Sequence, residues 1–151
     1  MTATVDLLAF ARADHRLPDA VRADTLRLLA DTLAVGAAGA TAPGADAILT
    51  AARAMGSGSD ARLIGSPKSS GERLPGPGAA FVNGYRIHCL EWDAVHEPAV
   101  VHALSTVVAA LGAAIDRRGG CDPEVALTAL AVGVDIACGL DARAGEPERE
   151  G

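Results

Sequence analysis

The stretch that decides the fold is AAFVNGYRIHCLEWDAVHEPAVVHALSTVVAALGAA, residues 79–114. The part up to residue 96 has the composition of a helix, and Pro98 both stops that helix and suits the first turn of the next one. In this second helix one apolar stripe recurs at helical spacing and comprises Val100, Leu104, Val107, Val108, Leu111 and Ile115. The opposite face is small and partly polar, which predicts a close neighbouring helix or the lining of a crevice.

The N-terminal part of the chain shows the same periodicity. A short helix is predicted over residues 5–13, and a longer one follows Pro18 and ends in the glycines Gly36 and Gly39. A third, alanine-rich helix is predicted over residues 44–55. Three helices therefore precede the deciding stretch.

The C-terminal part adds one more helix, which begins at the sequence DPE of residues 122–124 and runs to Leu140. It is apolar nearly all round, so it is expected to be central. Residues 65–78 are rich in Gly and Pro and are predicted to be a loop. We expect an all-α helical bundle with one domain over residues 1–142 and a charged flexible tail over residues 143–151.

Composition narrows the class of protein. Of the 151 residues, 50% are hydrophobic but only 3% are aromatic, so the core must consist of Ala, Val, Leu and Ile. The net charge is −6 and no basic stripe is present, which argues against nucleic-acid binding. Three cysteines without CxxC spacing and an N-terminus unlike a secretory signal indicate the cytoplasm. The two apolar runs fall short of the ~20 residues of a membrane span, so no membrane is expected.

The candidate functional site is the segment from His88 to His102, which holds three of the four histidines. His102 could transfer a proton or bind a carboxylate, or it could only hydrogen-bond across a helix interface. Glu91 lies three residues after His88 and would share a helix face with it, either as an orienting carboxylate or as a simple surface pair. Asp93 falls on another face and could be a polar partner at a helix end.

Other residues of this segment have weaker signals. His96 sits at the expected helix break, where solvation is the simplest interpretation, and Asn83 either reaches a ligand or has a capping or turn role. The spacing of eight residues from His88 to His96 and six on to His102 matches no familiar metal-ligand pattern, so no metal site is predicted. No phosphate-binding or dinucleotide-binding glycine pattern is present either, and no cofactor is expected.

Residues 79–114 resemble the MmgE/PrpD family, which includes 2-methylcitrate dehydratase and cis-aconitate decarboxylase. The family shows an Ala-rich helix, an Asn-Gly, a histidine, an acidic motif and then a histidine that enters an apolar helix. The stretches DTLAVGAAGA, residues 31–40, and ALTALAVGVDIACGL, residues 126–140, resemble two further helices of the family. The resemblance covers nearly the whole chain.

The resemblance implies a large helical domain, a second smaller α/β domain and usually a homodimer. It implies a cofactor-free lyase that dehydrates, decarboxylates or isomerises carboxylate-bearing substrates. Glu91 stands where the family has the first Asp of its acidic motif, Asp93 matches a later acid, and His102 matches the active-site histidine. Glu91 and His102 are thus the expected catalytic residues, with Asp93, His88, Asn83 and His96 as substrate-binding residues.

Some positions depart from the family pattern. Glu91 is one methylene longer than Asp, Ala94 and Val95 replace an acid and a hydroxyl residue, and Ala103 stands where proline is common. Family enzymes are longer than this sequence, so we expect a separate chain to supply the remaining half of the enzyme. The expected assembly is a homo-oligomer or a hetero-oligomer with a second MmgE/PrpD-like chain. The alternatives are a non-catalytic binding or scaffold homologue and a small enzyme repurposed for an unrelated substrate.

Overall fold

The computed structural model describes residues 3–66 and 71–144, which form six helices and one two-stranded sheet. In chain order the elements are α1 (Ala3–Arg12), α2 (Asp19–Gly39), α3 (Ala45–Ala54), β1 (Ala61–Arg62), β2 (Arg73–Leu74), α4 (Gly76–His88), α5 (Ala103–Arg117) and α6 (Pro123–Ala144). Because helices make up most of the described residues and the only sheet among them has two short strands, the predicted all-α class is confirmed.

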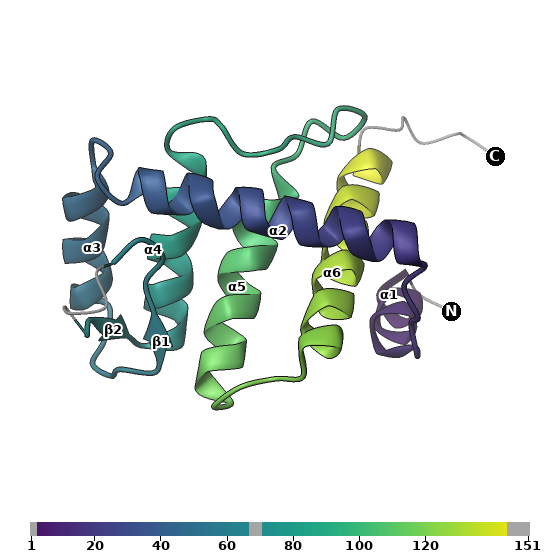
Figure 1. Cartoon of the computed structure of the whole chain (residues 1–151), viewed down its shortest axis with the longest axis horizontal. Coiled ribbons are helices and arrows are strands. Elements are labelled where there is room, and N and C mark those ends of the chain that lie inside the picture. The colour runs from purple at the N-terminus through teal and green to yellow at the C-terminus, as the bar shows by residue number, and fades with distance from the viewer. Residues whose placement is uncertain (1–2, 67–70, 145–151) are drawn as a thin grey trace.

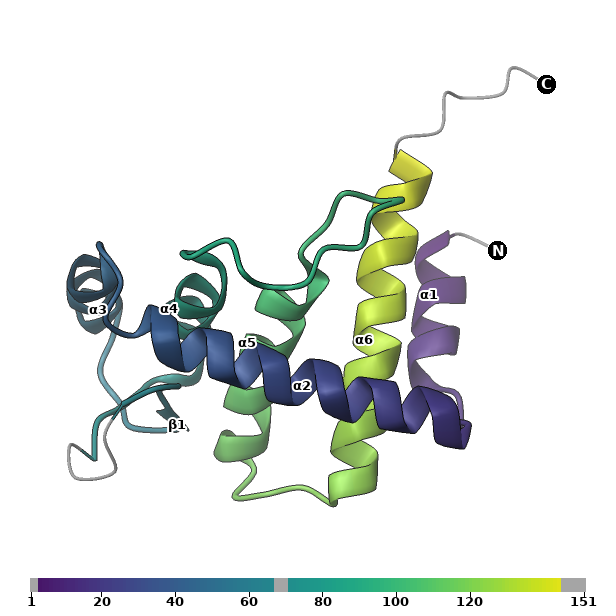
Figure 2. The same cartoon turned by 45° about the horizontal axis from the view of Figure 1, so that its top comes forward.

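The helices form one row that is crossed by a single long helix. Helices α3, α4, α5, α6 and α1 lie side by side, and α2 runs across them (Figures 1 and 2). The closest pair is α4 and α5, and α2 packs against α4, α5 and α6. This arrangement brings the C-terminal end of α4 beside the N-terminal end of α5.

Glycines allow α2 and α4 to cross closely. A Cβ atom added to Gly39 would lie 1.9 Å from the backbone oxygen of Arg86, and one added to Gly36 would lie 3.0 Å from Ile87. Helix α2 ends at Gly39 as predicted, but Gly36 lies within it. The absence of a side chain at both positions therefore allows α4 to pack closely against α2.

The central helix is α5 rather than α6. Its buried residues face both sides of the helix and comprise Ala103, Leu104, Ser105, Val108, Ala109 and Ala113. The small face predicted from the sequence therefore meets α4. Helix α6 was expected to be central, and this expectation is wrong: only 22% of its apolar window Pro123–Leu140 is buried. With a mean hydropathy of 1.6 over 18 residues, this window meets the length and composition of a membrane span, as the core helices of many proteins also do.

Small aliphatic side chains fill the core, as the low aromatic content predicts. One cluster lies around α3, the strands and α4, and consists of Ala52, Ala61, Leu63, Leu74, Ala79, Val82 and Ala113. A second lies where α4, α5 and α6 meet, and consists of Ile87, Leu104, Val108, Ala109 and Leu130. The only tryptophan, Trp92, is 67% exposed and outside both clusters.

The short sheet is tied to the end of α5 by a carboxylate. β1 and β2 are antiparallel, with Arg62 opposite Arg73. The Arg62 backbone nitrogen donates to Asp116 Oδ2 at 2.7 Å, and its guanidinium also donates to this carboxylate, at 2.6 Å from Nη2 to Oδ1. Hydrogen bonds from the Arg62 side chain, with smaller contributions from its backbone and from the charges of Arg62 and Arg73, lower the pKa of Asp116.

The connection between α4 and α5 is longer than the sequence suggests. The helix predicted up to residue 96 ends at His88, and the helix predicted from Pro98 begins at Ala103. Glu91 and Val100 have φ angles of 54° and 52°, so the chain turns through left-handed backbone at both positions. Val100 is consequently 80% exposed and not part of the apolar stripe of α5.

Two predicted irregular segments lie partly outside the described residues. Helix α4 begins at Gly76, so the last residues of the predicted loop 65–78 are helical, and residues 67–70 are not described. Helix α6 continues to Ala144, which places the start of the predicted tail in a helix, and residues 145–151 are not described.

Candidate functional site

Two histidines meet where α4 ends and α5 begins. His88 is the last residue of α4 and His102 is the N-cap residue of α5. Small residues in the packed faces permit this approach, since a Cβ on Gly84 of α4 would lie 3.4 Å from the Ser105 oxygen. The two imidazole rings are 4.6 Å apart at their centroids and inclined by 61°.

Asp93 lies between the two rings. Its side chain is 0% exposed, and Oδ1 is 3.1 Å from His88 Nδ1. Oδ2 is 3.1 Å from His102 Nδ1. The second contact has the distance of an ion pair but not the angles of a hydrogen bond, so the buried His102 Nδ1 has no hydrogen-bond partner among the described residues. We call His88, Asp93 and His102 the triad.

The loop returns Asp93 to the helix ends. Glu91 N donates to the His88 oxygen at 2.8 Å, which closes a turn directly after α4. Farther on, the backbone of His96 pairs with that of Val101, which closes the rest of the loop above α5. Asp93 was expected on another helix face than His88, but with the helix ended it faces His88 instead.

Glu91 has a different environment. Its side chain is 80% exposed, and Oε1 is 3.9 Å from His88 Nε2. No contact between Glu91 and His102 is present in the described part of the chain. The structure thus brings Glu91 near His88, as the spacing suggested, but places Asp93 rather than Glu91 beside His102.

Two of the sequence-predicted site residues lie outside the triad. The buried side chain of Asn83 accepts a hydrogen bond from Ile64 N at 2.9 Å and donates one to the Arg62 oxygen at 3.0 Å. Both ends of its amide are therefore used to hold the β1 segment on α4. His96 is exposed and contributes its backbone to the loop.

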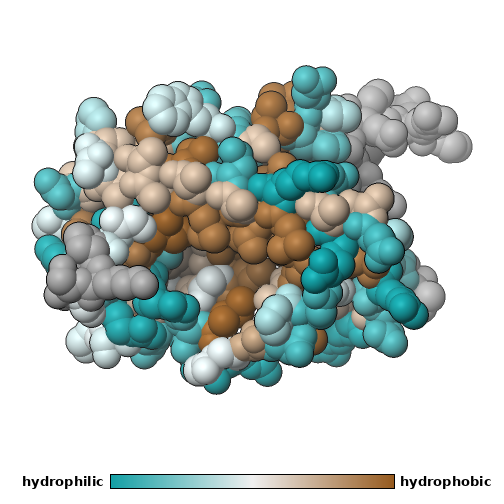
Figure 3. All heavy atoms as spheres, viewed as in Figure 1, coloured by the Kyte–Doolittle hydropathy of each residue, from teal (hydrophilic) through white to brown (hydrophobic). Residues whose placement is uncertain are grey.

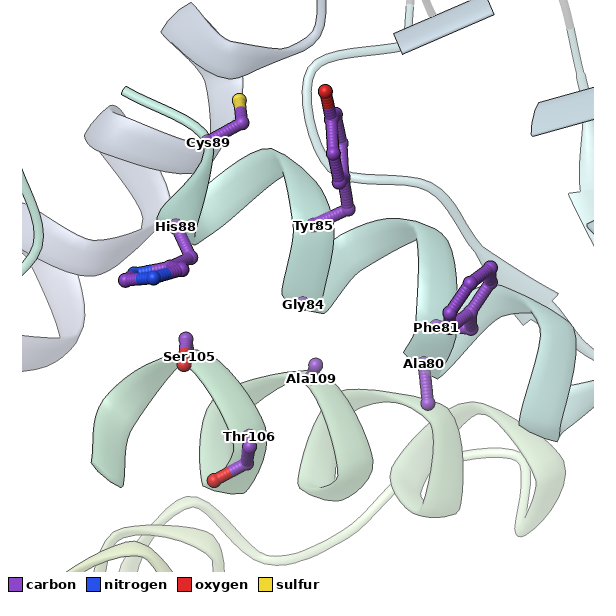
Figure 4. Close-up of a pocket in the computed structure, with 9 residues that line it drawn as sticks. All are labelled: Ala80, Phe81, Gly84, Tyr85, His88, Cys89, Ser105, Thr106 and Ala109. Atoms are coloured by element: carbon purple, nitrogen blue, oxygen red, sulfur yellow. The ribbon is translucent and has the colours of Figure 1, made fainter. Parts of the chain in front are cut away.

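A groove of about 480 Å³ adjoins the triad between α4 and α5 (Figure 4). Its rim includes Phe81 and Tyr85 from α4, with Ser105 and Thr106 from α5, and the His88 ring reaches across toward Ser105. The hydroxyls are already engaged, because Ser105 donates to the His102 oxygen at 2.8 Å and Thr106 to the Ala103 oxygen at 3.0 Å. The groove is also lined by His88, whose imidazole borders it.

Cys89 is not an activated nucleophile. Its sulfur points away from α5 (Figure 4) and lies 3.8 Å from the Gly39 oxygen. Burial raises the pKa of the Cys89 thiol, which reduces the reactive thiolate.

The triad can act on protons or bind a cation. A carboxylate at Nδ1 fixes the orientation of an imidazole and leaves Nε2 for a reacting group. The three residues also offer potential metal-ligand atoms, all within 4.8 Å of one another. The spacing of the histidines gives no sign of this cluster, because its third member is Asp93, which only the folded loop brings beside them. Glu91 and Asp93 are two residues apart, and nothing in the sequence indicates which of the two carboxylates contacts both histidines.

The comparisons with known proteins agree with the resemblance seen in the sequence. The family model of the MmgE/PrpD N-terminal domain matches residues 8–151. Neither the search of curated proteins nor the search of solved structures gave a match.

Proposed function

Because the chain belongs to the MmgE/PrpD family through its N-terminal domain, we propose that it is a lyase-type enzyme or enzyme subunit. The family includes dehydratases, and its domain implies a related function here. The proposed chemistry is cofactor-free proton transfer at a carbon next to a carboxylate, leading to dehydration, decarboxylation or isomerisation.

The observation that carries this proposal is the buried carboxylate between two imidazoles. Asp93 is hydrogen-bonded to His88 Nδ1, and its other carboxylate oxygen lies 3.1 Å from His102 Nδ1, so both rings can present Nε2 to a substrate. We assign His102 as the acid–base residue and Asp93 as its positioning residue. In a dehydration His102 would take the proton, the C–H electron pair would form the new double bond, and hydroxide would leave the adjacent carbon.

The position of His102 favours an anionic substrate. It stands at the N-terminus of α5, and no side chain caps this end of the helix. Backbone N–H groups and the helix dipole there stabilise negative charge, worth about 0.3–1 kcal/mol for an exposed anion. A substrate carboxylate placed at this end would sit beside the ring that moves the proton.

Glu91 receives a lesser role than the sequence suggested. Its exposed carboxylate is near His88 Nε2 and not near His102. We propose that Glu91 interacts with the His88 ring at the entrance of the site, whereas Asp93 is the carboxylate partner of His102.

We also propose that a second copy of this chain covers part of the apolar surface. Hydrophobic residues gather across the middle of the face in Figure 3. A hollow of about 580 Å³ lies there, and its lining includes Leu26 and Leu33 of α2, which are 43% and 42% exposed. Large exposed apolar patches mark interaction sites. A different MmgE/PrpD-like chain is the competing occupant.

The proposed activity is tested by deuterium incorporation. The chain, purified with any co-purifying partner, is incubated in D₂O with a panel of di- and tricarboxylic acids and followed by NMR. We expect deuterium uptake, or release of water or CO₂, for at least one acid. His102→Gln should lower the rate by roughly 10²–10⁴-fold, the usual contribution of a general acid–base group.

Two further variants separate catalysis from structure. Asp93→Asn should lower kcat with little change in KM, because it acts by orienting His102. His96→Gln is the matched control, since His96 is exposed and outside the triad, and it should retain full activity. Undiminished turnover by His102→Gln, or no reaction with any acid of the panel, would favour a binding or scaffold module instead.

A further inference from the structure

We propose that the groove between α4 and α5 binds an unbranched alkyl chain of the substrate, which is therefore a carboxylic acid with an aliphatic tail. This assignment rests on the proposed function for the carboxylate end of the molecule. The tail end is argued from the shape and lining of the groove, and its binding can be measured without turnover.

The groove begins at the triad and follows α4 away from it. Ala80, Gly84 and His88 are four residues apart and form one row on α4. Phe81 and Tyr85 form the neighbouring row. In Figure 4 His88 lies near one end of these rows and Phe81 near the other. Because His88 belongs to the triad, an extended ligand in the groove would have one end beside the proposed acid–base centre.

The groove is long enough for a chain of several methylene groups. Phe81 and His88 are seven residues apart on α4, and at about 1.5 Å per residue this separation is roughly 10 Å. A fully extended octyl chain has a comparable length. The volume of about 480 Å³ also falls within the range of small-molecule sites, about 300–1,000 Å³.

The lining favours an apolar ligand. No Asp, Glu, Lys or Arg is among the described residues that line the groove. The hydroxyls of Ser105 and Thr106 donate to backbone oxygens of their own helix, and the Tyr85 hydroxyl donates to the Pro43 oxygen at 2.7 Å. A polar group that enters such a lining loses hydrogen bonds to water without replacing them, whereas an alkyl chain has none to lose.

Phe81 provides apolar surface that such a chain would cover. It is 47% exposed, although it is one of only two phenylalanines in the sequence. Between Phe81 and His88 the groove is lined by small residues, including Gly84 and Ala109, which leave room for a ligand beside the aromatic ring.

The two ends of the site differ in polarity, and this difference sets the orientation of the substrate. His102 stands at the N-terminus of α5, which no side chain caps, and backbone N–H groups there favour an anion. Beyond His88 the groove carries no charge. The carboxylate end therefore lies at His102, and the tail runs along α4 toward Phe81. An acid with a further carboxylate in place of the tail would bring an unpaired charge into the groove.

The test is a calorimetric titration of the 151-residue chain, purified with any co-purifying partner. The probes are succinate, butylsuccinate, hexylsuccinate and octylsuccinate, each below its micelle concentration. We expect the affinity to rise by about 2–4-fold for each added methylene that enters the groove. Octyltrimethylammonium has the tail without the carboxylates and should bind more weakly than octylsuccinate. An affinity independent of chain length, or equal binding of the ammonium ion, would overturn the proposal.

Two phenylalanine variants locate the tail. Phe81→Glu places a carboxylate at an exposed position of the groove, so octylsuccinate should bind this variant no more tightly than succinate does. Phe10→Glu is the matched control, because Phe10 is 43% exposed, belongs to α1 and does not line the groove. It should keep the full dependence on chain length. An unchanged dependence in Phe81→Glu would refute the site.

Folding and oligomeric state are checked for each variant by circular dichroism and light scattering. Thr106→Glu, at an exposed position on the α5 side of the groove, decides the matter if Phe81→Glu is unfolded. A folded Phe81→Glu variant with a smaller mass than the unchanged chain would show that the groove is a contact between chains and would contradict the tail site.

Failure of the tail site can be distinguished from failure of the proposed function. Binding that tightens with chain length, without deuterium uptake by any acid, would support the tail site and contradict the acid–base role. Turnover of short acids, without any effect of chain length on affinity, would support the acid–base role and overturn the tail site.

Discussion

Asp93 and Asp116 are carboxylates with little or no exposure that differ in what they face. Asp93 faces two imidazoles, whereas Asp116, 9% exposed, binds Arg62 and lies 4.0 Å from Arg73. Guanidinium groups stay charged at every accessible pH. Asp116 is therefore paired with cations that stay charged, whereas Asp93 contacts two imidazoles.

The lowered pKa of Asp116 predicts a pH-dependent contribution to stability. A carboxyl group whose pKa is lower in the folded chain stabilises the fold above its unfolded pKa of about 3.9, and this contribution is lost as the pH falls through the folded value. Asp116→Asn should therefore lower the Tm at pH 7, and the difference from the unchanged chain should shrink below about pH 4. Thermal denaturation between pH 7 and pH 3 measures this. A constant difference across the range would contradict it.

At the scale of the elements, the crossing of α2 over α4 sets where the triad lies, because it fixes the end of α4. Gly39→Ala would place a Cβ 1.9 Å from the Arg86 backbone oxygen, so the helices must separate. We expect a loss of roughly 2–3 kcal/mol in the free energy of unfolding, typical of overpacking. Chemical denaturation measures the loss.

Gly112→Ala is the matched control for this crossing. Gly112 is an exposed position within α5, and nothing lies within 4 Å of an added Cβ. Alanine should stabilise the helix by about 0.5–1 kcal/mol. Equal effects of the two substitutions would mean that helix propensity, and not the close crossing of α2 and α4, determines how Gly39→Ala changes the free energy of unfolding.

At the scale of the whole molecule, α6 and α2 leave apolar side chains uncovered. If a second copy covers the hollow below α2, the chain should be larger than a monomer by light scattering. Replacing Leu26 and Leu33 together with Gln should shift it toward the monomer, because both side chains are partly exposed and line this hollow. Met55→Gln, at a 65% exposed position outside the hollow, should leave the mass unchanged. A monomer in every case would contradict the second copy.

The sequence predicted the elements that depend on local signals. Proline and an acid start α2 and α6, small aliphatic residues form the core, and the small face of α5 meets a close neighbour. These features follow from backbone preferences and side-chain volume, which each residue carries with it. The sequence also made the segment from His88 to His102 a candidate site, because its ionisable groups stand out against apolar helices, and this assignment stays a prediction.

Tertiary structure alone decided which acid joins the histidines. The sequence predicted one helix through Asp93, and on that helix Glu91 was the partner of His88. The left-handed backbone at Glu91 instead turns the chain, sends Glu91 into solvent and buries Asp93 between the rings. Helical periodicity cannot reveal such a turn, because the packing of α4 on α5 sets the position of both rings and hence which carboxylate can be buried between them.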